Sequence, residues 1–237
     1  MYVPPSFAEA DPAELRAFLG RYSFAALVTQ GEGGLVASHL PLLFDPEIGP
    51  NGGLLGHMAR ANPQWKDVRG EAMAIFSGPH AYVSPSWYEA EGTVPTWNYA
   101  VVHAYGTFHR IEDEVELLGI LRRSVGTYEG GRAEPWIFDE SSPHVGPMLR
   151  AIVGFRVEIT RLAGKFKLSQ NHPEERRARV IRGLAGEENP GSRAVAAIMA
   201  ARERAATLST LLAADGARDQ QPGQESAGRG EDHQDGV

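Results

Sequence analysis

The sequence predicts an α+β fold in which a mainly antiparallel β-barrel forms the centre and helices lie around it. Two observations carry this prediction: short strand-like segments follow one another closely as far as residue 159, and helical patterns take over after Pro173. Antiparallel strands can follow each other through short turns, whereas parallel strands need a long crossover between them. The chain has 237 residues, of which 42% are hydrophobic, and this is enough to bury a core.

Helix starts are marked by a residue that can cap the first turn, followed by proline. Asp11 and Pro12 form one such pair, and Asn62 and Pro63 form another. A capping oxygen accepts from the free N–H groups of the first turn, and proline lacks the N–H group that this turn leaves unpaired. Helices are therefore predicted from 11 to about 20, from 62 to 70, and after the acidic run at 112–114.

Strand-like segments fill most of the chain between these helices. Residues 24–29 and 36–44 flank a glycine-rich turn at 31–34, which predicts a β-hairpin. Further strands are predicted at 54–58, 73–76, 81–83, 101–108 and 152–159.

The last part of the chain is predicted to be helical and then polar. Helices are expected at 173–184 and from 192 to about 212, the second with a buried stripe of Val195, Ile198 and Met199. Residues 214–237 lack Leu, Ile and aromatic residues, so they cannot bury enough surface to order themselves. We expect one domain over 1–213, with C-terminal helices at about 173–213, and a disordered acidic tail over 214–237.

Composition excludes several classes of protein. The chain has no cysteine, which removes disulfides, cysteine nucleophiles and thiolate metal sites, and its histidines are scattered, so we expect no metal site. The formal net charge is −7, the sign opposite to that of a general nucleic-acid binder. No apolar run has the roughly 18 residues of a membrane span, and we expect a cytoplasmic protein. Dinucleotide, phosphate-loop and Gly-x-Ser-x-Gly motifs are missing.

Two segments could hold a phosphate. In the first, Arg60 lies beside a predicted helix start, whose free N–H groups favour anions. The alternative, which residue chemistry alone favours, is that Asn62 only caps the helix and Arg60 is solvated. In the second, an extended run would place Lys165, Lys167, Ser169 and Asn171 on one face. The alternative there is an edge strand protected by lysines.

Tyrosines and tryptophans gather between residues 82 and 105. The six are Tyr82, Trp87, Tyr88, Trp97, Tyr99 and Tyr105. Such side chains combine an apolar body with a polar group, so they are typical of a wall around a ligand or of a subunit interface. Ordinary half-buried strand residues are the alternative.

Several blocks of the sequence resemble the PaiB-type FMN-binding negative transcriptional regulators. The blocks are Met1–Pro4, Ser38–Pro41, Gly56–Pro63, Gly78–Tyr88, Val94–Tyr99 and Lys165–Asn171. The resemblance covers about residues 1–205. It implies an FMN-binding split β-barrel, similar to flavin reductases and pyridoxamine-phosphate oxidases, that usually forms a homodimer with the flavin near the interface.

The resemblance favours the cofactor interpretation of both segments and adds the strand that passes the flavin ring in similar barrels. The predicted FMN-binding residues are Ser38, His39, Leu40, His57, Arg60, Asn62, Lys165, Lys167, Ser169, Gln170 and Asn171. The predicted pocket or interface residues are Tyr82, Trp87, Tyr88, Trp97 and Asn98. No catalytic residue is predicted.

Three functions remain open at the level of sequence. The chain is an FMN-binding repressor acting directly or through a partner, an FMN-dependent oxidoreductase of the flavin-reductase or pyridoxamine-phosphate-oxidase type, or a flavin-binding dimer without chemistry. The family label allows DNA as a partner, but a DNA contact would need a basic face. The one basic cluster is Arg176, Arg177, Arg179 and Arg182, and it is mixed with Glu174 and Glu175.

Overall fold

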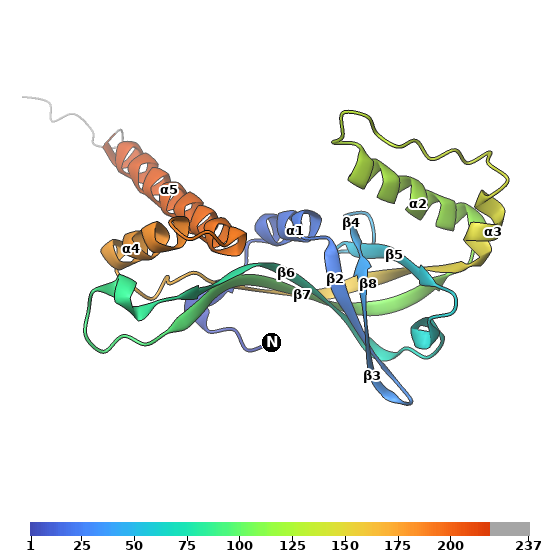
Figure 1. Cartoon of the computed structure of the whole chain (residues 1–237), viewed down its shortest axis with the longest axis horizontal. Coiled ribbons are helices and arrows are strands. Elements are labelled where there is room, and N and C mark those ends of the chain that lie inside the picture. The colour runs from blue at the N-terminus through green and yellow to red at the C-terminus, as the bar shows by residue number, and fades with distance from the viewer. Residues whose placement is uncertain (219–237) are drawn as a thin grey trace, which may run out of the picture.

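The computed structural model describes residues 1–218 and contains one eight-stranded antiparallel sheet that curls without closing (Figure 1). The strand order is β3-β2-β6-β7-β8-β5-β4, and β1 pairs with β8. The strands are β1 (Ala8–Glu9), β2 (Phe24–Gly31), β3 (Gly34–Pro41), β4 (Leu43–Asp45), β5 (Gly53–Ala59), β6 (Arg69–Val83), β7 (Thr96–Ile111) and β8 (Ile152–Lys167). The helices are α1 (Pro12–Arg21), α2 (Glu114–Glu129), α3 (Val145–Arg150), α4 (Glu174–Ala185) and α5 (Pro190–Arg218). The predicted split barrel is confirmed.

The main core lies between the sheet and the helices α1, α4 and α5, which share one side of β6 and β7 (Figure 1). Phe18 of α1 and Val195 of α5 pack there against alternate residues of the long strands, such as Phe76 and Val102. Side chains alternate along a strand, so only every second residue of β6, β7 and β8 enters this core. The remaining residues form a second face.

That second face, called the outward face below, is crossed by a row of residues paired directly across five strands. The row is His39, Ala26, Ile75, His103 and Ala163, from β3 through β2, β6 and β7 to β8. Helices α1, α4 and α5 lie on the other side, and the N-terminal residues pass beneath this face (Figure 1). Helix α2 covers only its far end, where Ile120 packs with Ile111 of β7 and Leu55 of β5. Along the row from His39 to Ala163, the outward face is therefore a sheet surface that the helices leave uncovered.

Three sequence predictions need correction. The helix predicted at 62–70 is only the four-residue 3-10 helix η2 (Pro63–Lys66), because Arg69 already begins β6 and Gly70 takes a φ of 68°. The strands predicted at 73–76 and 81–83 are one strand, β6, interrupted by an irregularity between Ser77 and His80. Helix α5 runs on to Arg218 instead of ending near 212.

The rest of the predicted tail, residues 219–237, lies outside the described residues. Within residues 1–218, no helix combines the length and apolarity needed to cross a membrane.

The close contact of β7 with β8 gives a test of the sheet. A Cβ atom on Gly106 would collide with the backbone of Glu158, whereas a Cβ on Gly119 of α2 would meet nothing within 4 Å. We expect Gly106→Ala to lower the free energy of unfolding by about 1–3 kcal/mol through overpacking. Gly119→Ala, the control, should raise it by roughly 0.5–1 kcal/mol because alanine favours helix. Urea denaturation measures both changes, and equal stability of the two variants would contradict the described packing.

Candidate functional site

The predicted cofactor-binding residues fall into two groups at opposite ends of β8. The first, the β5-end group, comprises Ser38, His57, Arg60 and Asn62; the second, the β8-end group, comprises Lys165, Lys167, Ser169, Gln170 and Asn171. Ala59 pairs with Ile152 at the start of β8, and Lys165 comes thirteen residues later on the same strand. At the usual rise per residue this is roughly 40 Å along the strand. Arg60 and the two lysines therefore lie at opposite ends of β8.

Within the β5-end group, a hydrogen bond joins Asn62 to Ser38. The Asn62 amide donates from Nδ2 to Ser38 Oγ at 2.9 Å, and its Oδ1 accepts from the backbone N–H of Gln64 at 3.0 Å. Burial lowers the pKa of His57, which favours a neutral imidazole there. Ser38, His57 and Asn62 thus come from three segments but share one end of the barrel.

Arg60 belongs to this group but holds the protein chain itself. Its Nε donates to the carbonyl oxygen of Arg150 at 2.8 Å, and its Nη2 donates to that of Ile152 at 2.9 Å. Nη1 lies 3.6 Å from a carboxylate oxygen of Glu112. The guanidinium therefore joins the end of β5 to the start of β8, and the predicted phosphate contact stays a prediction.

His39 and Leu40 point to opposite sides of β3. His39 is exposed on the outward face, with its ring stacked against Phe24 at a centroid distance of 6.4 Å. Leu40 packs against the main core. Of this predicted strand, His39 is the side chain placed to meet a ligand on the outward face.

The two lysines of the β8-end group have different surroundings. The Lys165 ammonium lies 5.6 Å from the ring centres of Tyr2 and Tyr99 and makes no ion pair with a residue of the described chain. Lys167 donates to Thr96 Oγ1 and, at 2.8 Å, to the carbonyl oxygen of Trp97. Burial, and secondly the charge of Lys165, lower the pKa of Lys167. Lys165 is therefore a cation of the outward face that makes no ion pair within residues 1–218.

The alternation predicted for residues 165–171 stops at Lys167, where β8 ends. The backbone of Ser169 has a φ of 65°, a left-handed conformation that residues other than glycine rarely adopt, and it bends the chain here. Its hydroxyl is buried and accepts from Asn98 Nδ2 at 2.9 Å. Gln170 folds back and accepts from the backbone N–H of Leu168 at 2.6 Å. Ser169 and Gln170 therefore build the bend, and they do not extend the face of the lysines.

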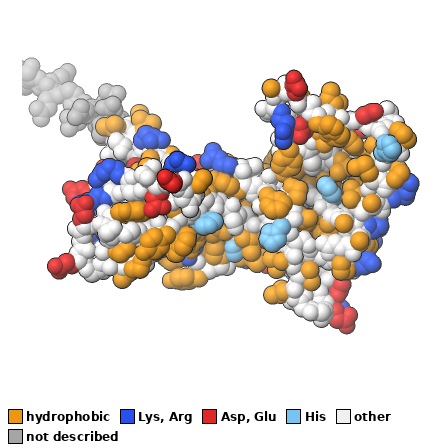
Figure 2. All heavy atoms as spheres, in the orientation of Figure 1, with side chains coloured by type: hydrophobic (Ala, Val, Ile, Leu, Met, Phe, Trp, Pro, Cys, Tyr) orange, Lys and Arg blue, Asp and Glu red, His pale blue; other side chains and the backbone are white. Residues whose placement is uncertain are grey.

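The aromatic cluster is divided by the pleat of the sheet. Tyr82 and Trp97 are paired across β6 and β7, 46% and 52% exposed, on the outward face. Tyr88 and Asn98 are buried, and Trp87 is half-buried against Gly183 of α4. Figure 2 shows hydrophobic side chains, with histidines among them, over the part of the sheet that lies below α4 and α5 in Figure 1.

Sequence analysis missed three residues of the outward face. They are Tyr2, His103 and Arg161; Arg161 stacks on the Tyr105 ring at 3.6 Å, and the His103 ring contacts the Tyr105 hydroxyl at 3.3 Å. Burial, followed by the charges of the N-terminus and Arg161, lowers the pKa of His103. The alternation of Trp97, Tyr99, Val101, His103 and Tyr105 along β7 is the signal that points to His103.

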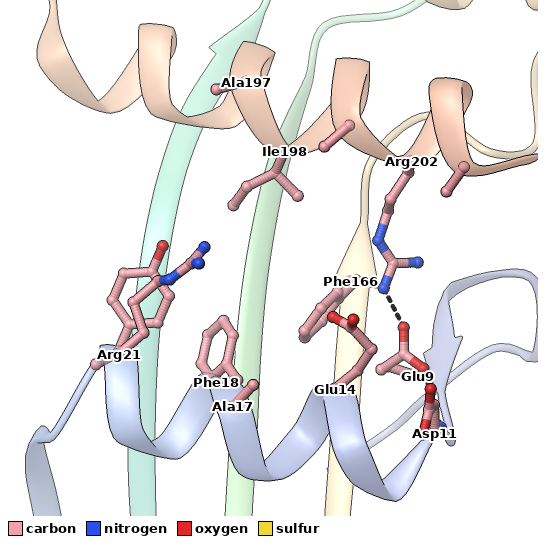
Figure 3. A pocket seen from close by; sticks show the side chains of 13 residues that line it. Glu9, Asp11, Glu14, Ala17, Phe18, Arg21, Phe166, Ala197, Ile198 and Arg202 are labelled. Carbon is pink, nitrogen blue, oxygen red and sulfur yellow. Dashed lines mark hydrogen bonds and ion pairs between the residues drawn. The ribbon is translucent and has the colours of Figure 1, made fainter.

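A cavity of about 630 Å³ lies elsewhere, between α1 and α5 (Figure 3). Phe18, Phe166 and Ile198 line it, and Arg202 at its rim is bonded to Glu9. None of the predicted site residues lines this cavity. We therefore place the candidate site on the outward face.

The outward face has the chemistry that a flavin mononucleotide requires. Ala26, Ile75 and Ala163 give a flat apolar row for a planar ring, and His39 and His103 lie in the same row as hydrogen-bonding groups. Lys165, beside that row, has no carboxylate partner among residues 1–218, so its charge is available to a phosphate. The residues present fit the cofactor.

Comparison with known proteins agrees with this chemistry. Residues 1–161 match a family model described as "Putative FMN-binding domain". The chain is 38% identical over 202 residues to "Protease synthase and sporulation protein PAI 2" of Bacillus subtilis, covering 84% of this chain and 96% of that protein. It is 31% identical over 234 residues to an uncharacterized protein of Emericella nidulans, covering 81% and 92% of the two chains.

Two solved structures share the fold at low sequence identity. The flavocytochrome Anf3 of Azotobacter vinelandii has a TM-score of 0.52 and 17% identity, covering 73% of this chain and 75% of its own. An FAD and heme binding protein of Mycobacterium smegmatis has a TM-score of 0.50 and 16% identity, covering 68% and 73%.

Titration of the histidines tests the environment of the site. We expect the imidazoles of His57 and His103 to titrate below the ordinary value of 6.5, because burial disfavours their charged forms. As the pH falls, these two histidines take up protons in the unfolded chain at a higher pH than in the folded protein. Their contribution to the free energy of unfolding is therefore fully present above pH 6.5 and is lost as the pH falls below it. NMR titration of the ring protons measures both values. Midpoints at or above 6.5 would show that the two rings are solvated.

Proposed function

Because this chain belongs to the FMN-binding domain family that its sequence matches, we propose that two copies pair through their outward faces and share FMN between them. The family confirms FMN as the predicted cofactor. In this proposal, each flavin lies between the β5-end group and His39 of one chain and Lys165 of the partner.

One observation carries the proposal: the end of β5, which carries Arg60, and Lys165 are separated by thirteen residues of β8, roughly 40 Å along the strand of one chain. Along the strand direction these groups lie at opposite margins of the sheet, one where β5 ends and β8 begins and the other where β8 ends. A two-fold axis through the middle of the outward face exchanges these margins, so it places each group against the other one of the second copy.

The surface of the outward face supports pairing. Tyr2 is 82% exposed, and Tyr82 and Trp97 are about half exposed on the same side. Contiguous apolar surface of this kind is typical of an interface. A homodimer would cover it and would exclude water from the flavin.

Each chain contributes groups with distinct roles toward the cofactor. Lys165 supplies a positive charge for the phosphate, and the row of Ala26, Ile75 and Ala163 lies against the ring. A neutral His103 can donate to or accept from the polar edge of the ring. The bound flavin supplies one- or two-electron chemistry, and the protein sets its orientation and surroundings.

We assign the chain a role in negative transcriptional regulation that acts through a partner. The name of the Bacillus subtilis relative refers to protease synthesis and sporulation, which supports a regulatory role. Direct DNA contact by α4 is disfavoured, since Arg177 is bonded to Glu203 and Arg179 to Glu89. Arginines that are neutralised within the chain release few counterions from DNA.

A second candidate function is an FMN-dependent oxidoreductase. A cavity of about 370 Å³ reaches Lys167, two residues from the cation assigned to the phosphate, and is large enough for a small substrate. Turnover of NADH or NADPH with an electron acceptor by the FMN-loaded protein would favour this function over the regulatory one.

Mixing two variants tests the shared site. His39→Glu and Lys165→Glu each place a negative charge at one margin of the outward face, so each homodimer should lose FMN because both of its sites are damaged. A heterodimer of the two variants keeps one undamaged site, so co-refolding should restore about one quarter of the wild-type FMN per chain. Absorbance of the bound flavin and light scattering measure cofactor content and mass.

The control for this experiment is Arg182→Glu on the exposed side of α4, which should bind FMN as the wild type does. Absence of any rescue, with both variants folded and dimeric, would place the whole flavin site in one chain. A monomer that retains FMN would also overturn the shared site.

A further inference from the structure

A second cavity lies where the loop after η3 (Pro85–Tyr88), the end of β8 and the start of α4 meet. Its volume is about 370 Å³. The residues used below are Tyr88 from η3, Lys167 at the end of β8, His172 in the following turn and Arg176 on α4. Four separate segments therefore converge on one small space.

The cavity gathers positive charge. The pKa of His172 is lowered by burial and then by the charges of Arg176 and Lys167, so the three groups are electrostatically close. Arg176 makes no ion pair within residues 1–218, although its neighbours Arg177 and Arg179 on the same helix are paired with Glu203 and Glu89. Glu91 is the only carboxylate among the lining residues, and it is exposed. Two cations held close together without a counter-charge repel each other unless an anion joins them.

The cavity also holds a buried hydroxyl without a partner. Tyr88 is 2% exposed, its ring lies 4.6 Å from that of His172, and its Oη has no hydrogen-bond partner in the described chain. An unpaired buried hydroxyl destabilises the folded state, and such groups are rare. By contrast, the neighbouring Asn98 and Ser169 are bonded to each other. The Tyr88 hydroxyl is therefore the donor that the protein itself does not use.

We propose that this cavity binds the oxyanion group, carboxylate or phosphate, of a small molecule other than FMN. The Tyr88 hydroxyl donates to one oxygen of the anion, and Lys167 and Arg176 balance its charge. Phe7 and Val94 also line the cavity, so they would contact an organic remainder of the ligand. The site would provide the regulator with an effector or the oxidoreductase with a substrate, and it does not depend on where FMN binds.

Two variants and two probes test this site on the FMN-loaded protein. Tyr88→Phe should raise the melting temperature of the free protein, because it removes an unpaired hydroxyl, and should weaken anion binding several-fold. Arg176→Gln should weaken it about tenfold, as loss of a charge-assisted contact does. Inorganic phosphate and succinate are the probes, and the NMR signals of the His172 ring report binding. A bound anion raises the pKa of His172, and the probe that binds more tightly identifies the kind of oxyanion.

The matched controls are Tyr128→Phe and Arg182→Gln, which change a hydroxyl and a charge away from the cavity. Both should bind the probes as the wild type does. The proposal is overturned if neither probe shifts the His172 signals, or if Arg182→Gln weakens binding as much as Arg176→Gln. Loss of FMN from Tyr88→Phe would assign the cavity to the flavin phosphate and would likewise overturn it.

Discussion

The alternation of side chains along β7 and β8 is the constraint on which the rest of the molecule depends. On β7, Ala100, Val102 and Ala104 are buried beneath the helices, whereas Tyr99, Val101 and His103 face the other way. The buried set stabilises the fold by removing apolar surface from water. The opposite set receives no cover from α1 to α5, so the same strands that build the core also present an apolar, histidine-bearing surface.

The length of β8 adds the second constraint. Its first residue neighbours the end of β5, where Arg60 holds the carbonyl oxygens of Arg150 and Ile152, and its last residues carry the lysines. A continuous strand is rigid enough to keep these ends apart. The proposal that two copies share FMN rests on this separation and on the uncovered row. The end of β8 also divides the β8-end residues between the outward face and the Tyr88 cavity.

Much of the fold could be predicted from local patterns, because caps, turns and strands depend on neighbouring residues. The hairpin at 31–34 and the cap at Asp11 are examples, and Asp11 accepts from the N–H of Ala13 at 2.9 Å. The site could be predicted only as a set of residues. Which of these residues come together depends on three long-range or local features. They are the pairing of β5 with the start of β8, the backbone carbonyl oxygens that accept hydrogen bonds from Arg60, and the left-handed backbone conformation of Ser169, which ends the alternation of side chains. None of these leaves a signal in one sequence.

The most direct test of the central claim, that a flavin is shared across the outward faces of two chains, would be to determine a crystal structure of the FMN-loaded protein. The account predicts a two-fold dimer in which each FMN contacts His39 of one chain and Lys165 of the other. An FMN whose protein contacts all come from a single chain, with the row from His39 to Ala163 open to solvent, would contradict it.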